Sequence, residues 1–111
     1  MAKKGLKAKE DAQKFLADVP EEYVFWCCDG QIIRNMKQLA EALLGMTDET
    51  FRYHSNNNKK DFSRWVSDVI GDEKLADHLV DASDRTVAAG YVATRIVLLG
   101  KGLAQSTTPL P

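Results

Sequence analysis

At residues 23–34 the chain reads YVFWCCDGQIIR, an aromatic and β-branched run followed by Asp29-Gly30 and a second apolar pair. Aromatic and β-branched side chains favour β-strands. The Asp-Gly dipeptide favours a two-residue type I′ turn, which joins two antiparallel strands. The stretch therefore predicts a β-hairpin, and a two-residue turn at this position would pair Trp26 with Ile33.

This predicted hairpin carries large apolar side chains on both faces. In the predicted register, Tyr23 and Phe25 share one face with Ile32. Trp26 shares the other face with Ile33. An antiparallel ribbon on the surface of a domain normally has one polar face, and an isolated two-stranded ribbon is only marginally stable in water. We therefore expect helices or a second chain to cover each face.

Helical periodicity dominates the sequence on both sides of the hairpin. Apolar residues recur at intervals of three and four, and polar N-cap residues or glycines stand at the ends of these runs. The predicted N-caps of the helices that follow the hairpin are Asn35, Thr47, Asp61, Asp72 and Ser83. The sequence thus predicts an α+β fold that is predominantly α-helical, with five or six short helices packed around one β-hairpin.

The length and composition of the chain indicate one domain. It has 111 residues, of which 44% are hydrophobic and 28% are charged, close to the average of globular domains. We expect a flexible basic arm at residues 1–7, a single compact α-rich domain at residues 8–104 and a flexible tail at residues 105–111.

The sequence also indicates a cytoplasmic protein with no membrane partner. The lysines near the N-terminus are not followed by an apolar stretch, so no signal peptide is expected. The most apolar run, residues 87–99, contains Arg95 and is shorter than the roughly 20 residues that span a bilayer. Cys27 and Cys28 are adjacent and would point to opposite faces of a strand, which suits free thiols in a reducing compartment.

Few residues suit catalysis or metal binding. Vicinal cysteines diverge on a strand, whereas zinc sites place two or more residues between such ligands. A nucleophile pair of Cys27 or Cys28 with His54 is an alternative that would need a long-range contact. The sequence contains no nucleophile elbow, phosphate-binding glycine loop or metalloprotease helix. We therefore expect no enzyme activity, no metal and no cofactor.

His54 is the histidine best placed for a structural role. It follows Phe51 and Tyr53 in a predicted helix, so we expect its ring to be partly buried and oriented by the carboxylate of Asp61. Buried polar groups are normally paired. His54 and Asp61 are therefore predicted to form a polar site that ties two helices together.

The charges of the chain are balanced overall but unevenly distributed. Fifteen basic and sixteen acidic residues give a net charge of −1, which removes the positive field that non-specific nucleic-acid binders use. A later group of acidic residues is expected to form a solvated helix face, and it comprises Asp68, Asp72, Glu73, Asp77, Asp81 and Asp84. The lysine-rich arm supports nucleic-acid binding as an alternative function, with candidate contacts at Lys3, Lys4, Lys7 and Lys9.

The last predicted helix combines small residues with a wide apolar stripe. Ala88, Ala89, Gly90 and Ala93 would let another helix approach closely, from the same core or from a second chain. Together with the two-sided hairpin, this pattern indicates a small protein-interaction or assembly module that self-associates as a homodimer, or that binds another protein. The candidate interface residues are Tyr23, Phe25, Trp26, Ile32, Ile33, Val87, Tyr91 and Ile96.

Several short motifs follow one another within residues 25–79. The aromatic strand ends in Asp29-Gly30, and Asn35-Met36-Lys37-Gln38-Leu39 begins the next helix. The later motifs are Phe51-Arg52-Tyr53-His54, Asp61-Phe62-Ser63-Arg64-Trp65 and Gly71-Asp72-Glu73-Lys74-Leu75-Ala76. This order, over about half of the chain, resembles an uncharacterised family of small prokaryotic and archaeal domains of unknown function. The resemblance implies a compact α-rich module and favours binding or assembly over chemistry.

Overall fold

The hairpin consists of β1 (Phe25–Trp26) and β2 (Ile32–Ile33), in a computed structural model that describes residues 10–107, with side chains for residues 10–101. The two strands are antiparallel, and Phe25 pairs with Ile33 while Trp26 pairs with Ile32. The predicted hairpin is therefore present, but the predicted pairing of Trp26 with Ile33 is wrong by one residue.

A three-residue turn causes this shift in register. The N–H of Gly30 donates to the carbonyl of Cys27 at 2.9 Å, and the N–H of Cys27 donates to the carbonyl of Gln31 at 2.9 Å. Gly30 has φ +95°, and no described residue other than glycine has positive φ, so Asp29 does not adopt the conformation of a type I′ turn. Instead, a type I turn followed by a left-handed glycine forms a G1 bulge. The Asp29 carboxylate supports this turn by accepting the N–H of Gln31 at 3.0 Å.

The observed register gives the hairpin one buried face and one exposed face. Phe25 is 8% exposed and Ile33 is 1% exposed, so both lie in the core. Trp26 points the other way and is 70% exposed, while Ile32 beside it is half-buried. The predicted sharing of one face by Trp26 and Ile33 is therefore wrong, because the one-residue shift places Ile33 on the face of Phe25 and Ile32 on the face of Trp26.

Helices make up most of the rest of the described chain, which confirms the predominantly helical α+β class. Residues 10–16 form the first helix. The remaining elements are η1 (Glu21–Tyr23), α2 (Met36–Gly45), α3 (Asp48–His54), α4 (Asp61–Trp65), η2 (Val66–Ile70), α5 (Glu73–Val80) and α6 (Arg85–Thr107). Gly71 ends η2 with φ +93°, a left-handed conformation that glycine adopts without strain.

Three of the five predicted N-caps form as expected, at Asn35, Thr47 and Asp72. The Asn35 side chain accepts the N–H of Gln38 at 2.8 Å, and the Gln38 side chain accepts the N–H of Arg34 at 2.7 Å. This reciprocal pair is a variant of the capping box. The hydroxyl of Thr47 accepts the N–H of Thr50 at 3.1 Å at the start of α3. These local bonds fix where α2 and α3 begin.

Two other caps differ from the prediction. Asp61 is the first residue of α4 rather than its N-cap, and its carboxylate binds the ring of His54 instead. Asp84, not Ser83, caps α6, because its carboxylate accepts the N–H of Val87 at 2.9 Å. At α6 a neighbouring carboxylate takes the cap in place of Ser83, and at α4 the Asp61 carboxylate binds a ring on the preceding helix while Lys60 supplies no side-chain cap. Sequence spacing alone does not rank such alternatives.

The core is formed by α2, α4, η2, α5 and α6 together with the buried face of the hairpin. Leu39 and Leu43 of α2 are fully buried, and so is Val92 of α6. Ala88 and Ala89 are also buried, so these two small residues serve the packing of α6 within its own core. Gly90 and Ala93, the other two members of the small-residue set, are exposed.

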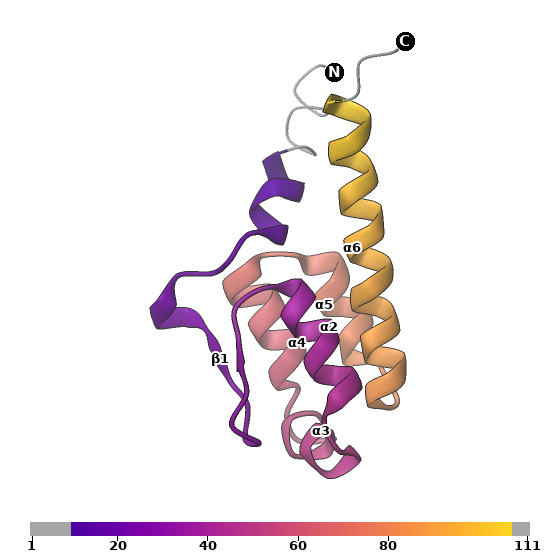
Figure 1. Cartoon of the computed structure of the whole chain (residues 1–111). Helices are drawn as coiled ribbons and strands as arrows, with labels where there is room; N and C mark the ends of the chain where they lie inside the picture. Colours follow the sequence, from indigo (N-terminus) through magenta and orange to yellow (C-terminus); the bar gives the residue numbers. More distant parts are fainter. Residues whose placement is uncertain (1–9, 108–111) are drawn as a thin grey trace.

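The molecule is elongated because α6 is long. Its principal extents are 49 × 27 × 24 Å, and its radius of gyration is 14.7 Å, compared with about 13 Å for a compact domain of this size. Figure 1 shows the C-terminal half of α6 rising beyond α2 and α5. The helix continues to Thr107, past residue 104, where the sequence places the end of the domain.

Candidate interaction surface

The solvent-facing side of α6 carries no charge over four turns. Within residues 86–100 the sequence contains one charged residue, Arg95, and its guanidinium points inward to the carboxylate of Asp72. The segment is about 22 Å long at 1.5 Å per residue. We call its exposed residues the outward face of α6: Thr86, Val87, Gly90, Ala93, Thr94, Val97 and Leu98.

This lack of charge sets α6 apart from the other surface helices. The exposed side of α5 includes the charged residues Glu73, Lys74 and Asp77, beside His78 and Val80. A helix whose outer side faces water usually segregates charged and polar residues there. On α6, Val97 and Leu98 are instead 55% and 54% exposed. The outward face of α6 therefore combines two exposed aliphatic side chains with an absence of charge.

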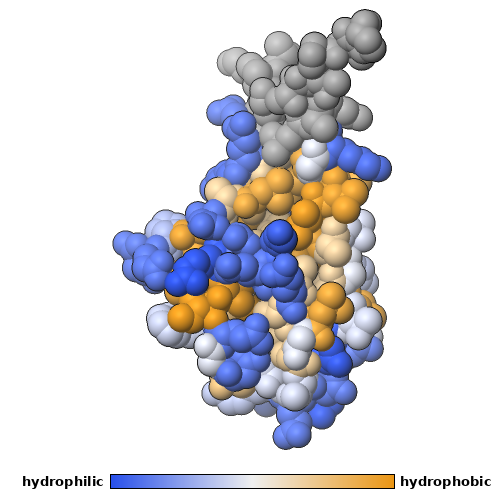
Figure 2. Space-filling model, in the orientation of Figure 1, coloured by the Kyte–Doolittle hydropathy of each residue, from blue (hydrophilic) through white to orange (hydrophobic). Residues whose placement is uncertain are grey.

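Apolar surface also gathers next to this face. Figure 2 shows it over the upper part of α6 and over the adjoining residues 10–16. Leu98 lines two clefts. One, of about 400 Å³, runs between α6 and Phe15 of the first helix, and the other, of about 530 Å³, runs between α6 and His78 of α5. Lys74 and Arg95 line both clefts. Leu98 thus forms the ridge between two hollows on the same side of the molecule.

The predicted interface residues of α6 are only partly on this face. Val87 is 37% exposed and belongs to it. Tyr91 and Ile96 are half-buried against the core, and the Tyr91 ring packs on His78 with ring centroids 5.1 Å apart. Val97 and Leu98 were missed by the sequence analysis. The signal that would have found them is the absence of outward charge within residues 86–100.

The predicted interface residues of the hairpin separate into two groups. Phe25 and Ile33 are core residues, with Ile32 half-buried beside them. Tyr23 and Trp26 are 57% and 70% exposed. The surface of the hairpin therefore has two exposed aromatic side chains, but not the continuous apolar ribbon that the predicted register implied.

His54, at the end of α3, and Asp61, at the start of α4, form the predicted polar pair. His54 is 5% exposed, and its Nδ1 lies 2.9 Å from Oδ2 of Asp61. Its Nε2 accepts the backbone N–H of Cys28 at 3.0 Å, so the ring proton is on Nδ1 and is donated to Asp61. The ring also packs edge-on against Phe25 with centroids 5.1 Å apart. His54 thus joins the hairpin, α3 and α4, and both of its nitrogens are engaged within the fold.

The two cysteines occupy opposite environments. Cys27 is buried and Cys28 is exposed, and both are free thiols. Burial is the main cause that raises the pKa of Cys27 from 9.0 to about 11. The raised pKa keeps Cys27 protonated, and its contribution to stability is lost as the pH rises from about 9 to about 11, because the unfolded chain releases this proton first.

We therefore expect only one of these two thiols to react quickly with a disulfide reagent in the native protein. At pH 8 a chromogenic disulfide reagent should react quickly with Cys28 and reach Cys27 only in denaturant, because the thiolate is the reactive form. A stopped-flow count of released chromophore measures this, and Cys28→Ser should remove the fast phase. Two fast thiols in the native wild type would contradict the burial of Cys27.

Asp72 departs from the prediction of a solvated acidic face. Its side chain is 1% exposed. Arg95 Nε lies 2.6 Å from Oδ2 of Asp72, and Nη2 lies 3.2 Å from Oδ1, which makes a bidentate ion pair. Asp72 also caps α5 by accepting the N–H of Leu75 at 3.2 Å, as the sequence predicts. This pair fastens the middle of α6 to the start of α5.

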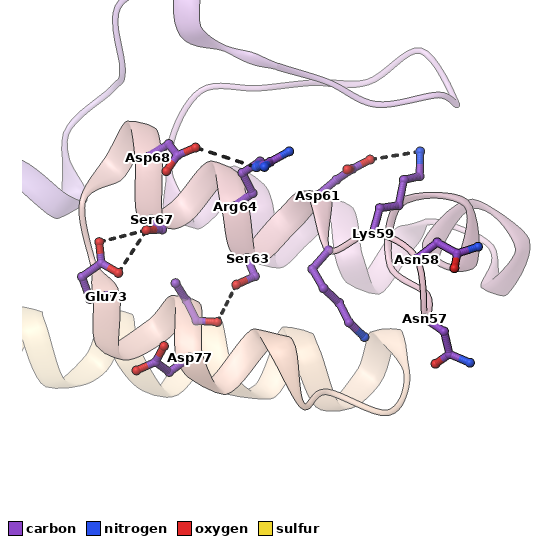
Figure 3. Close-up of a pocket in the computed structure, with 12 residues that line it drawn as sticks. Asn57, Asn58, Lys59, Asp61, Ser63, Arg64, Ser67, Asp68, Glu73 and Asp77 are labelled. Carbon is purple, nitrogen blue, oxygen red and sulfur yellow. Dashed lines mark hydrogen bonds and ion pairs between the residues drawn. The ribbon is translucent and has the colours of Figure 1, made fainter.

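A polar cleft of about 450 Å³ lies between α4, α5 and the loop that precedes α4. Figure 3 shows that its polar side chains largely bind one another. Ser63 donates to the carbonyl of Ala76 at 2.7 Å, and Ser67 donates to both oxygens of Glu73 at 3.0 and 2.8 Å. These bonds connect α4 and η2 to α5, so the groups serve the fold.

Other predicted features lie outside these sites. Lys3, Lys4, Lys7 and Lys9 lie outside the described residues. Within residues 10–107, no group of three or more His, Cys, Asp or Glu residues could hold a metal ion. In the same part of the chain, no helix is long and apolar enough to cross a membrane.

Comparisons of the chain with protein-family models, curated proteins and solved structures found no match. The resemblance to a family of small domains stays a prediction.

Proposed function

We propose that this protein is a small interaction module that self-associates through the outward face of α6. The observation that supports the proposal is the outward face of α6, which carries no charge within residues 86–100 and on which Val97 and Leu98 are more than half exposed. Soluble domains rarely present such a stretch to water without a partner. A second copy of the chain carries the same surface, so two copies bury it together in a closed dimer.

The size of this face suits a dimer contact. A helix segment of about 22 Å, with the ridge of Leu98 and the hollows on either side, is long enough for the core of an interface that covers about 800 Å² on each partner. Full burial of a Val or Leu side chain stabilises an interface by about 1.5–3 kcal/mol. Val97 and Leu98 are therefore the expected energetic centre of the contact.

A charge placed on this face tests the proposal. We expect wild-type protein at about 50 µM to sediment as a dimer of the 12.4 kDa chain. Val97→Glu should raise the dissociation constant at least thirtyfold, because an unpaired carboxylate in an interface costs about 2–5 kcal/mol. Analytical ultracentrifugation over a concentration series measures both quantities.

Leu44→Glu is the matched control for this experiment. Leu44 is, like Val97, an exposed aliphatic residue, 60% exposed, but it lies at the C-terminal end of α2. This variant should dimerise like the wild type, and circular dichroism should show the same helix content for all three proteins. A wild type that stays monomeric at 100 µM, or a Leu44→Glu variant that weakens the dimer as much as Val97→Glu, would contradict the proposal.

A further inference from the structure

The arrangement of the two copies can be inferred from how charge and side-chain size are distributed along α6. This inference rests on the proposed self-association and adds its geometry. We infer that the α6 helices of two copies pair antiparallel across their outward faces, with the two-fold axis near Thr94. Thr94 is exposed and lies near the middle of residues 86–100, which we call the uncharged segment because no charged side chain of these residues lies on the outward face of α6.

The charges at the two ends of the uncharged segment favour the antiparallel arrangement. Asp84 and Arg85 stand before the segment, and Lys101 directly follows it. Arg85 is half-buried and paired with Asp48 at 2.9 Å, whereas Asp84 and Lys101 are exposed. In an antiparallel pair centred on Thr94, Lys101 lies opposite Val87 of the second copy, one helical turn from that copy's Asp84. Each lysine then approaches a carboxylate at both ends of the contact. A parallel pair would instead set Lys101 beside Lys101 and Asp84 beside Asp84, which is repulsive.

The sizes of the side chains favour the same arrangement. Gly90 lies in the N-terminal half of the outward face, and the bulky pair Val97 and Leu98 lies in its C-terminal half. In the antiparallel pair Gly90 lies opposite Leu98 of the second copy. The Leu98 side chain then packs over Gly90, which has no side chain of its own. Because the pair is symmetric, the two backbones can approach closely at two equivalent places. A parallel pair would place glycine against glycine and leave a gap at one end.

Space around Gly90 is available for this contact. No heavy atom outside the helix lies within 4 Å of the position where a Cβ of Gly90 would stand. The place where the Leu98 ridge of a second copy would sit is therefore not filled by the same chain. The helix dipoles also favour this arrangement, because antiparallel dipoles that lie side by side attract each other, whereas parallel ones repel.

Disulfide trapping distinguishes the two arrangements. The experiment uses the full chain with Cys28→Ser, which removes the exposed thiol and leaves the buried Cys27. Three single variants are then made on this background: Val87→Cys, Thr94→Cys and Lys101→Cys. Each variant, and a mixture of the first and third, is oxidised at about 50 µM and analysed on non-reducing gels.

The antiparallel pair predicts a specific pattern. Thr94→Cys should cross-link with itself, because it lies at the two-fold axis. Val87→Cys alone should not, since its two copies are separated by fourteen residues, or about 21 Å, along the helix axis, and a disulfide needs Cα atoms within about 7 Å. The mixture of Val87→Cys and Lys101→Cys should cross-link at least tenfold more than either protein alone.

Three other patterns overturn the inference, and each bears differently on the proposed function. Efficient cross-linking of Val87→Cys with itself in a protein that sediments as a dimer would show a parallel pair, and the proposed function would stand without the inferred geometry. Absence of all cross-links in a protein that sediments as a monomer would remove the proposed function as well. A dimer that forms none of the cross-links would place its interface away from α6 and overturn both.

Discussion

Arg95→Leu should lower the free energy of unfolding by about 3–5 kcal/mol, because it leaves the buried carboxylate of Asp72 without its charged partner. Asp72 is 1% exposed in its side chain, whereas the Arg95 side chain is 22% exposed. Removal of the guanidinium therefore leaves a charge that water barely reaches. The leucine would cover the apolar wall of the cleft but supply no hydrogen bond.

Two further substitutions separate the causes of this effect. Arg95→Lys keeps the charge but loses the bidentate geometry, so we expect an intermediate loss of about 1–2 kcal/mol. Arg64→Leu removes an exposed ion pair in which Arg64 and Asp68 are 82% and 67% exposed in their side chains. That variant should change stability by less than about 0.5 kcal/mol. Urea denaturation followed by circular dichroism measures all three, and an Arg95→Leu loss below 0.5 kcal/mol would show that the buried pair is not stabilising.

The same ion pair has a consequence for the surface of α6. Arg95 is the one charged residue within residues 86–100, and its guanidinium is bound to Asp72 on the inner side of the helix. If Arg95 pointed outward, the exposed face would carry a charge at its centre. The contact that fastens α6 to α5 is therefore also what leaves the outward face of α6 without charge, so the fold and the proposed interface depend on one interaction.

Features that depend on neighbouring residues could be predicted from the sequence. The caps at Asn35 and Thr47 are examples, because the capping side chain and the N–H that it accepts are three residues apart. The turn at Asp29-Gly30 shows the limit of this reasoning. The dipeptide suits both a two-residue type I′ turn and the last positions of a three-residue turn with a bulge, and only the packing of Phe25 and Ile33 on one face decides between them.

Features that depend on distant residues could not be predicted. Asp72 and Arg95 are 23 residues apart, and nothing in the sequence around Asp72 distinguishes it from the exposed acidic residues nearby. The exposure of Val97 and Leu98 also depends on which side of α6 packs against α2. In contrast, the pairing of His54 with Asp61 joins two residues only seven positions apart, with one loop between their helices.

His54→Ala should lower the free energy of unfolding by about 2–4 kcal/mol, from the lost hydrogen bonds and the cavity left in the aromatic core. The ring is 5% exposed and packs against both Phe25 and Phe62, with centroids 5.1 and 5.3 Å away. Its removal would leave the backbone N–H of Cys28 and the carboxylate of Asp61 without this partner. His78→Ala is the matched control, because His78 is exposed, and a surface substitution of this kind changes stability by about 0.5 kcal/mol or less.

Two conservative substitutions then assign the loss to one nitrogen or the other. His54→Gln places an acceptor near the position of Nε2 and can keep the bond from Cys28, whereas His54→Asn places a donor near Nδ1 and can keep the bond to Asp61. Amide hydrogen exchange reports the first bond directly. The Cys28 amide should exchange at least tenfold faster in the Ala and Asn variants than in the wild type, and at a near wild-type rate in the Gln variant. Equal exchange rates in all four proteins would mean that the hairpin is held to α3 by its apolar contacts alone.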